Sequence, residues 1–294
     1  MRRIVAILLA AAPLGVAAAP LAVPRAVAAD PLIDAAHPAA MAAFVIPARD
    51  GAINAVLYSA AGVGPHPALL LLHGFPGNEQ NLDLAQAARR AGWTVLTLHY
   101  RGSWGSPGAF SFAHCAEDAA TAIAYLRSPA AAARGVDPAR IVVAGHSMGG
   151  IMAARVAADD PAILGAFLID PADFAAIGRS FADPAQRDSF LVGEVRGDMA
   201  PLAGTSEAAI MDEVAHAGRA LDLVATMPAL AGRPLALIGA TRGIGFMAEA
   251  AAMAARASGA RLLDAETLPT DHSFSDMRIA LASRLVTWLA QFQP

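Results

Sequence analysis

The sequence predicts an α/β fold in which a mostly parallel central sheet carries helices on both of its faces. Short apolar runs such as residues 68–72 and 93–99 alternate with longer helical stretches such as residues 115–126. Strands that are apolar along their whole length are typical of parallel sheets, because both faces of such a sheet are covered. Asp50 and Gly51 separate two apolar runs in a pattern typical of a hairpin, so we expect antiparallel strands at the N-terminal edge.

The expected elements follow one another in regular order along the chain. Strands are expected at residues 44–47, 52–58, 68–72, 93–99, 141–144, 163–169, 235–238 and 261–268, and helices at 81–91, 115–126, 148–158, 246–257 and 274–292. Residues 171–230 break this alternation, because they hold several Asp, Gly and Pro positions and only weak helical signals. We therefore expect one domain over residues 30–294, with an insertion at about 171–230 that lies over the sheet as a lid.

The composition fits a folded domain and argues against several other classes of protein. The chain has 294 residues, of which 56% are hydrophobic and 16% are charged, so it can bury a sizeable core. The net charge of −4 and the lack of a basic block argue against nucleic acid as a partner. Cys115 is the only cysteine, which excludes an intrachain disulfide and a cysteine cluster for zinc.

The segment 1–28 is typical of a signal peptide for export. Arg2 and Arg3 precede an apolar run over residues 4–19, and residues 26–28 (Ala-Val-Ala) fit a cleavage site with small residues at its ends. The alternative is a membrane anchor, but prolines and a glycine interrupt the run, which is shorter than the ~20 apolar residues of a spanning helix. We expect a periplasmic or secreted protein without stable membrane insertion after cleavage.

The sequence Gly-His-Ser-Met-Gly at residues 145–149 is the strongest chemical signal in the chain. It lies between the expected strand at 141–144 and the expected helix at 148–158. A serine on a sharp turn from strand to helix points outward at the edge of the sheet, and the flanking glycines leave room for the strained backbone. The N-terminus of the helix below favours negative charge that develops at the serine. This context indicates that Ser147 is a nucleophile.

Four short segments follow buried strands or the last strand of the chain, and their order resembles that of a known family. These segments are 73–77 (His-Gly-Phe-Pro-Gly), 100–106 (Tyr-Arg-Gly-Ser-Trp-Gly-Ser), 145–149 (Gly-His-Ser-Met-Gly) and 271–274 (Asp-His-Ser-Phe). From about residue 44 to 292 the chain resembles the α/β-hydrolase family, and most of all its bacterial esterases and serine aminopeptidases. The resemblance implies the α/β-hydrolase fold, with the expected parallel sheet, antiparallel edge strands and inserted lid.

The resemblance also implies roles for particular residues. His272 lies on the loop where the family places its general base, and it would take the proton of Ser147 and return it to the leaving group. The backbone N–H groups of Phe75 and Met148 would form the oxyanion hole, where one such donor is worth roughly 3 kcal/mol. The resemblance implies no metal and no organic cofactor.

The acid that would orient the histidine is left open by the sequence. The family usually places an aspartate just after the strand expected here at 235–238, but residues 239–245 read Gly-Ala-Thr-Arg-Gly-Ile-Gly and hold no carboxylate. Asp170, at the end of the preceding strand, is one candidate, and a site with no acid is the other main possibility. The remaining carboxylates to consider are Asp173, Asp271 and Asp276.

These features predict a serine hydrolase that cleaves a small-molecule carboxylic ester, or less readily an amide or peptide bond, through an acyl-enzyme on Ser147. Aromatic residues are candidates for an acyl pocket, with core packing as their alternative role: Phe110, Phe112, Phe174 and Phe181. The rival hypothesis is a non-catalytic relative that acts as a binding protein, because the usual acid position has no carboxylate. An acyltransferase is a third possibility.

Overall fold

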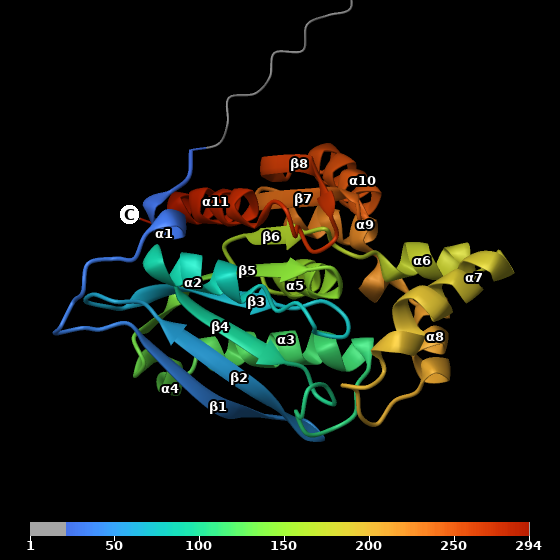
Figure 1. Ribbon diagram of the computed structural model, residues 1–294, viewed down its shortest axis with the longest axis horizontal. Helices are drawn as coiled ribbons and strands as arrows, with labels where there is room; N and C mark the ends of the chain where they lie inside the picture. Colours follow the sequence, from blue (N-terminus) through green and yellow to red (C-terminus); the bar gives the residue numbers. More distant parts are fainter. Residues whose placement is uncertain (1–21, 294) are drawn as a thin grey trace, which may run out of the picture.

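The computed structural model describes residues 22–293, which form an eight-stranded sheet with helices on both faces (Figure 1). The strands are β1 Ala40–Ala48, β2 Gly51–Ser59, β3 His66–Leu72, β4 Thr94–His99, β5 Val136–His146, β6 Ala166–Ile169, β7 Pro234–Arg242 and β8 Arg261–Asp271. Their order in the sheet is β1-β2-β4-β3-β5-β6-β7-β8. The pairs β1–β2 and β2–β4 are antiparallel and all other pairs are parallel, which confirms the predicted sheet and its antiparallel N-terminal edge.

Each face of the sheet has its own apolar core, because the strands present buried side chains to both sides. Helices α1 Arg25–Ala28, α2 Leu82–Arg90 and α11 Arg278–Leu289 cover one face. Helices α3 Phe112–Leu126, α5 Met148–Asp159 and α10 Gly245–Ala257 cover the other, and the short helix α4 Pro129–Ala132 precedes β5. The two cores hold the sheet rigid, so residues at the ends of its strands have defined positions.

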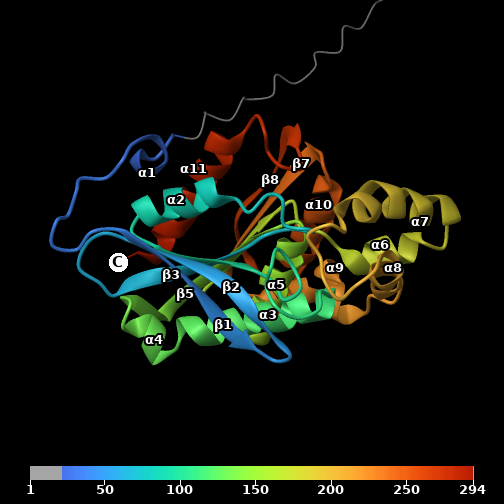
Figure 2. The ribbon, with the colours of Figure 1, turned by 60° about the horizontal axis from the view of Figure 1, so that its bottom comes forward.

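A series of short helices lies between β6 and β7, in the region predicted as an insertion without clear strands. It comprises α6 Phe174–Ser180, α7 Pro184–Phe190, a π-helical turn Leu191–Val195, α8 Glu207–Ala215 and α9 Leu223–Thr226, with 3₁₀ turns at Arg196–Asp198, Arg219–Leu221 and Met227–Leu230. Aspartate or serine side chains cap α6, α7, α8 and α9 at their N-termini. Figures 1 and 2 show α6, α7 and α8 grouped beyond one end of the sheet.

The last helix begins later than the sequence predicts. The apolar pattern predicts a helix from residue 274, but α11 starts at Arg278. Phe274 has a φ of 57° and is fully buried, so its backbone is left-handed and cannot belong to a right-handed helix. Strand β8 also runs three residues beyond the predicted end at 268, to Asp271, which places His272 directly at the end of a strand.

Part of the predicted signal peptide, residues 1–21, lies outside the described residues. Within the described part, α1 packs on α2 and α11, and Arg90 Nε donates a hydrogen bond of 2.5 Å to the carbonyl of Ala26. The fate of this segment, its cleavage and the export of the chain stay predictions. Within residues 22–293, no helix reaches the length and apolar character that crossing a bilayer requires.

A buried ion pair ties the loop after β4 to helix α3. Arg101 is 2% exposed, and its Nε donates to Asp118 Oδ1 over 2.6 Å while its backbone N–H donates to Oδ2 over 2.7 Å. Its remaining N–H groups reach Glu117 and the carbonyls of His114 and Arg49, the last in the hairpin turn between β1 and β2. The guanidinium therefore joins the edge hairpin, β4 and α3 at a single point.

Replacing Arg101 by Leu should lower the free energy of unfolding by about 3–5 kcal/mol, because the Asp118 carboxylate would stay buried without its cation. Urea denaturation of the purified variant measures this loss. The matched control is Arg155→Ala, which removes an exposed helical pair with Asp159 and should cost at most about 0.5 kcal/mol. Equal losses in the two variants would contradict the role assigned to Arg101.

Candidate active site

Ser147 lies at the turn between β5 and α5 with a strained backbone. Its φ of 56° and ψ of −120° are rarely adopted by a residue with a side chain. The flanking glycines permit this turn: a Cβ at Gly145 would lie 1.9 Å from the carbonyl oxygen of Gly149, and one at Gly149 would lie 2.2 Å from that of Leu72. The strand, turn and helix predicted around Ser147 are therefore present.

Hydrogen bonds on both sides of the turn hold the strained serine. Its N–H donates to Ile169 O over 2.9 Å, and its carbonyl accepts from the N–H groups of Gly150 and Ala172 at 2.9 and 3.0 Å. The serine is thus fixed to the end of β6 and to the start of α5. Strain of this kind persists only where the surroundings over-determine the conformation, which is typical of functional sites.

The side chain of Asp170 accepts hydrogen bonds from several parts of the site. It follows β6, its φ is 39°, and its side chain is fully buried. Oδ1 accepts from the N–H of Ala240 at 2.9 Å, while Oδ2 accepts from the N–H of Ile244 at 2.9 Å and from His272 Nδ1 at 2.6 Å. A buried carboxylate needs such donors, because burial without them costs several kcal/mol. The structure thus brings Asp170 and His272 together, although 102 residues separate them in sequence.

The missing carboxylate after β7 has a direct structural reason. A Cβ at Gly243 would lie 2.2 Å from Asp170 Oδ2 and 3.0 Å from the Cα of His272. Any side chain at this position would therefore occupy the space of the Asp170 carboxylate. The absence of an aspartate where the family usually carries one leaves room for the aspartate of the neighbouring strand.

The other carboxylates considered from the sequence have different partners. Asp173 caps helix α6 by accepting from the N–H of Ala176 at 2.8 Å, and burial raises its pKa. Asp271 accepts from the N–H of Ser275 at 2.8 Å, which lowers its pKa. Asp276 pairs with the side chains of Thr270 and Arg242, and both contacts lower its pKa. None of these three is hydrogen-bonded to His272 within residues 22–293.

His272 lies between Asp170 and the pocket in front of Ser147. Because a carboxylate can only accept, Nδ1 carries the proton of the neutral ring, and Nε2 has a lone pair free for a second role. Ser147 and His272 line the same pocket. Among the described residues, Ser147 makes no side-chain hydrogen bond to His272, and such bonds commonly tighten only in the complex with substrate.

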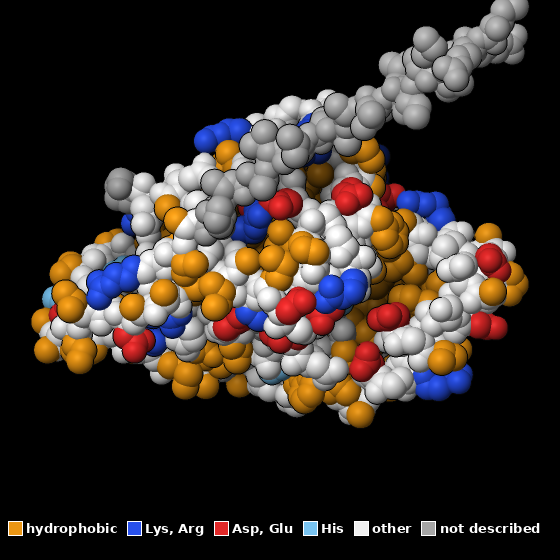
Figure 3. Space-filling model, turned by 45° about the horizontal axis from the view of Figure 1, so that its top comes forward, with side chains coloured by type: hydrophobic (Ala, Val, Ile, Leu, Met, Phe, Trp, Pro, Cys, Tyr) orange, Lys and Arg blue, Asp and Glu red, His pale blue; other side chains and the backbone are white. Residues whose placement is uncertain are grey.

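The pocket has a volume of about 390 Å³ and a mainly apolar wall. The starts of helices α3 and α10 and the loops at the sheet end supply one side, and the segment between β6 and β7 supplies the other. The lining residues are Phe75, Phe112, Ser147, Ala172, Phe174, Ile177, Phe190, Glu194, Val195, Ile210, Arg242, Gly243, Ile244, Met247 and His272. Figure 3 shows hydrophobic side chains gathered in the recess between the body and the part formed by α6–α8.

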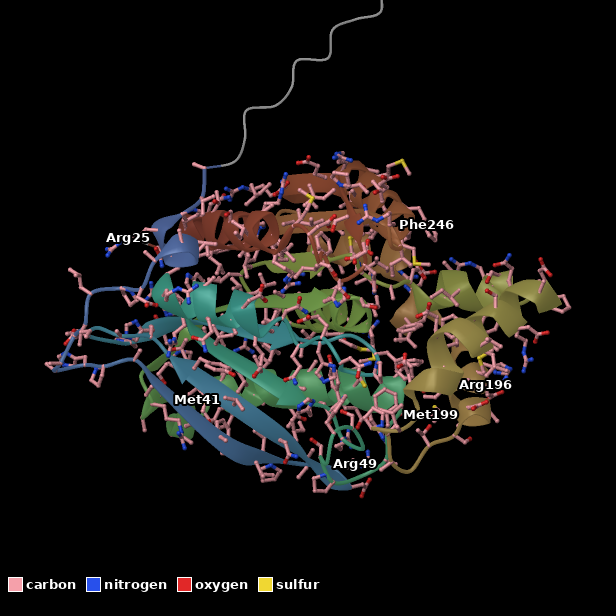
Figure 4. The ribbon with its side chains drawn as sticks, viewed as in Figure 1. Arg25, Met41, Arg49, Arg196, Met199 and Phe246 are labelled. Atoms are coloured by element: carbon pink, nitrogen blue, oxygen red, sulfur yellow. The ribbon has the colours of Figure 1, made fainter. Side chains whose placement is uncertain are left out.

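Two of the four phenylalanines predicted as pocket candidates line this pocket. Phe112 and Phe174 do so with ring centroids 4.2 Å apart, whereas Phe110 packs behind Phe75 and Phe112. Phe181 instead contacts Phe190. The sequence does not reveal Phe190 as a lining residue, because the π-helical turn that follows Phe190 has no recognisable pattern. Figure 4 places the exposed Phe246 at the start of α10, and the exposed Arg196 and half-buried Met199 on the segment after α7.

The two residues predicted for the oxyanion hole lie near Ser147. Met148 follows Ser147 as the first residue of α5, where the backbone N–H has no partner inside the helix. Phe75 lines the pocket beside Ser147, and its predecessor Gly74 is so close that a Cβ there would lie 2.9 Å from Ser147 Cβ. Within the described residues, no group of three or more His, Cys, Asp or Glu side chains is arranged to hold a metal ion.

Comparisons with known proteins place the chain among α/β hydrolases. The sequence profile of the alpha/beta hydrolase fold family matches residues 67–292. An uncharacterised protein of Mycobacterium tuberculosis is 36% identical over 99 residues, which span 33% of this chain and 34% of that protein. The chain therefore matches only about a third of the length of this curated relative.

Solved structures of similar fold include several esterases. The thermostable carboxylesterase EstE1, cloned from a metagenomic library, has a TM-score of 0.65 and 22% identity over 88% of this chain and 91% of its own. An esterase of the archaeon Pyrobaculum calidifontis has a TM-score of 0.61 and 20% identity over 86% of both chains. Brefeldin A esterase, a bacterial homologue of human hormone-sensitive lipase, has a TM-score of 0.60 and 18% identity over 86% of this chain and 74% of its own.

Replacing Gly243 by Ala should displace the Asp170 carboxylate from His272, because the new methyl group would overlap Oδ2. Proton NMR should then show a loss or shift of the low-field signal of the His272 Nδ1–H, and stability should fall by about 1–3 kcal/mol. Gly218→Ala is the control, since no atom of the described part of the chain lies within 4 Å of a Cβ there. An unchanged signal in the Gly243 variant would show that the contact is not as close as described.

Proposed function

The chain belongs to the α/β hydrolase fold family, and we propose that it hydrolyses carboxylic esters through an acyl-enzyme on Ser147. The observation that carries this proposal is the hydrogen bond of 2.6 Å between the buried Asp170 carboxylate and His272, on the pocket that Ser147 also lines. A buried acid that fixes the tautomer of a histidine beside a strained serine is the arrangement that nucleophilic acyl transfer requires.

The proposed reaction uses each member of this set in turn. His272 Nε2 takes the proton from Ser147 Oγ as the serine attacks the ester carbonyl, and Asp170 stabilises the imidazolium that forms. The ring then gives its proton to the leaving alcohol, and the acyl group stays on Ser147. Water, activated by the same histidine, releases the acid and restores the serine.

The oxyanion of the tetrahedral intermediate needs donors that are fixed before the reaction. We assign this role to the backbone N–H groups of Phe75, which lines the same pocket as Ser147, and of Met148, which follows Ser147 in the chain. The N-terminus of α5 also favours negative charge at this point. Together these dipoles would stabilise the intermediate by several kcal/mol, with roughly 3 kcal/mol from one donor.

The shape of the pocket supports an ester with a small to medium apolar acyl group. Its 390 Å³ is near the low end of ligand pockets, and phenylalanine and isoleucine side chains dominate its wall. The esterases of similar fold support esters as substrates in preference to amides or peptides. The charged residues on the lining, Glu194 and Arg242, are exposed to solvent, so we place the alcohol part of the ester near them.

Asp170→Asn should lower kcat by about 10³–10⁴-fold, because the imidazole loses its tautomer and the partner of its cation. Ester hydrolysis and the rate of labelling by a fluorophosphonate probe measure this effect. Ser147→Ala should abolish labelling, and His272→Ala should slow it as strongly as Asp170→Asn. Circular dichroism of each variant shows that the protein is folded.

Normal labelling of Asp170→Asn would assign the site as a Ser–His pair without this acid. Absence of labelling in folded wild type would remove the hydrolase proposal and favour the non-catalytic binding protein. Release of a transesterified product in the presence of an alcohol would instead support an acyltransferase.

Ile177→Trp should shift the preference toward shorter acyl chains, because Ile177 lines the pocket from α6 and a larger ring would fill it. We expect kcat/KM for octanoyl esters to fall at least ~10-fold while acetyl esters are little affected. Val192→Trp is the control: Val192 lies on the same segment, is 61% exposed, and does not line the pocket. Equal losses for all chain lengths would place Ile177 outside the acyl site.

A further inference from the structure

His146 is the last residue of β5, directly before Ser147, and it contacts the proposed base His272. Its Nε2 is 2.8 Å from the backbone carbonyl oxygen of His272, and the two ring centroids are 4.5 Å apart with 41° between the planes. The side chain is 4% exposed. The buried ring of His146 therefore lies against His272.

The hydrogen bond fixes the protonation of His146. A carbonyl oxygen can only accept, so Nε2 must carry the proton, and Nδ1 is left with its lone pair. Nδ1 is buried and has no hydrogen-bond partner among residues 22–293, and a Cβ at Gly74 would lie 3.5 Å from it. Burial lowers the pKa of His146 to about 3, and the nearby His272 adds to this effect, so the ring is neutral when the base is active.

Mere packing does not account for a histidine at this position. An apolar residue of similar size would fill the space without burying an unpartnered nitrogen, which costs stability. What the histidine adds is one N–H donor aimed at the backbone of His272 and one flat face against its ring. Both contacts act on the residue that would move the proton.

We propose that His146 is a positioning residue, which holds the plane and the backbone of His272 so that Nε2 of the base faces Ser147. This inference rests on the proposed function. Asp170 restrains the His272 ring through Nδ1. The His146 ring, with its centroid 4.5 Å from that of His272, limits rotation about the Cβ–Cγ bond of His272, and the hydrogen bond to the His272 carbonyl holds its backbone. The proposed nucleophile, Ser147, and the proposed positioning residue, His146, are thus adjacent in the chain.

Three variants separate the two contacts. His146→Phe keeps a flat ring and loses the donor, His146→Gln keeps an N–H donor and loses the ring, and His146→Leu loses both. His66→Phe is the matched control, because His66 Nε2 also bonds a backbone carbonyl, that of Gly62 at 3.1 Å, but lies away from the pocket. The titratable and charged groups near His146 are His73, His272 and Arg278, and all variants leave them in place.

The experiment measures kcat and KM for two esters of the same acid, one with a p-nitrophenol leaving group and one with an alkyl alcohol. We expect kcat to fall ~10-fold in the Phe and Gln variants and ~100-fold in the Leu variant, with KM within about twofold of wild type. The loss should be larger for the alkyl ester, because its leaving group needs a proton from His272. The unfolding free energy should change little in the Phe and Leu variants, because removal of the orphan nitrogen offsets the loss of the donor to the His272 carbonyl.

Unchanged kcat in the folded Phe and Leu variants would overturn the inference, and so would a loss that only follows a fall in stability or is equal for both esters. Fluorophosphonate labelling of wild type keeps this failure distinct from failure of the proposed function. Labelled wild type with equally fast variants removes only the role of His146, whereas unlabelled wild type removes the hydrolase proposal itself. The Phe variant, which keeps the ring volume, decides the question if the Leu variant does not fold.

Discussion

The arrangement at the sheet end depends on one buried carboxylate, that of Asp170. A carboxylate removed from water needs hydrogen-bond donors. Among the described residues, those of Asp170 are the backbone N–H groups of Ala240 and Ile244 and the side chain of His272. These donors lie at the end of β7, at the start of α10 and after β8, so satisfying one charge draws three separate parts of the chain together. The position of the proposed base follows from this requirement. The pocket in turn follows from the base, because His272 forms part of its wall.

The sequence predicted the parts of this site that depend on local patterns. Continuous apolar runs indicated the parallel strands, and the five residues around Ser147 indicated the turn from strand to helix. The choice among carboxylates could not be predicted, because it rests on backbone N–H groups and on the space left by Gly243, neither of which has a sequence pattern. The pocket wall between β6 and β7 was also out of reach, since its short helices take their position from packing rather than from periodicity.

The histidines of the chain illustrate why residue type alone did not reveal a role. His73 and His146 are both buried, and burial lowers the pKa of His73 to about 4 and that of His146 to about 3. His272, by contrast, is 38% exposed and has a carboxylate partner. Only the three-dimensional contacts distinguish the proposed base, His272, from the proposed positioning residue, His146. In sequence His146 was simply the residue before the nucleophile.

The crowding between Gly243 and Asp170 also limits how such a site can diverge. An aspartate after β7 and an aspartate after β6 cannot both point at the histidine, since the Cβ of the first would overlap the carboxylate of the second. Exchange of one arrangement for the other therefore has no intermediate in which both acids are in place. A single substitution at either position would therefore leave the histidine with a crowded or an absent acid.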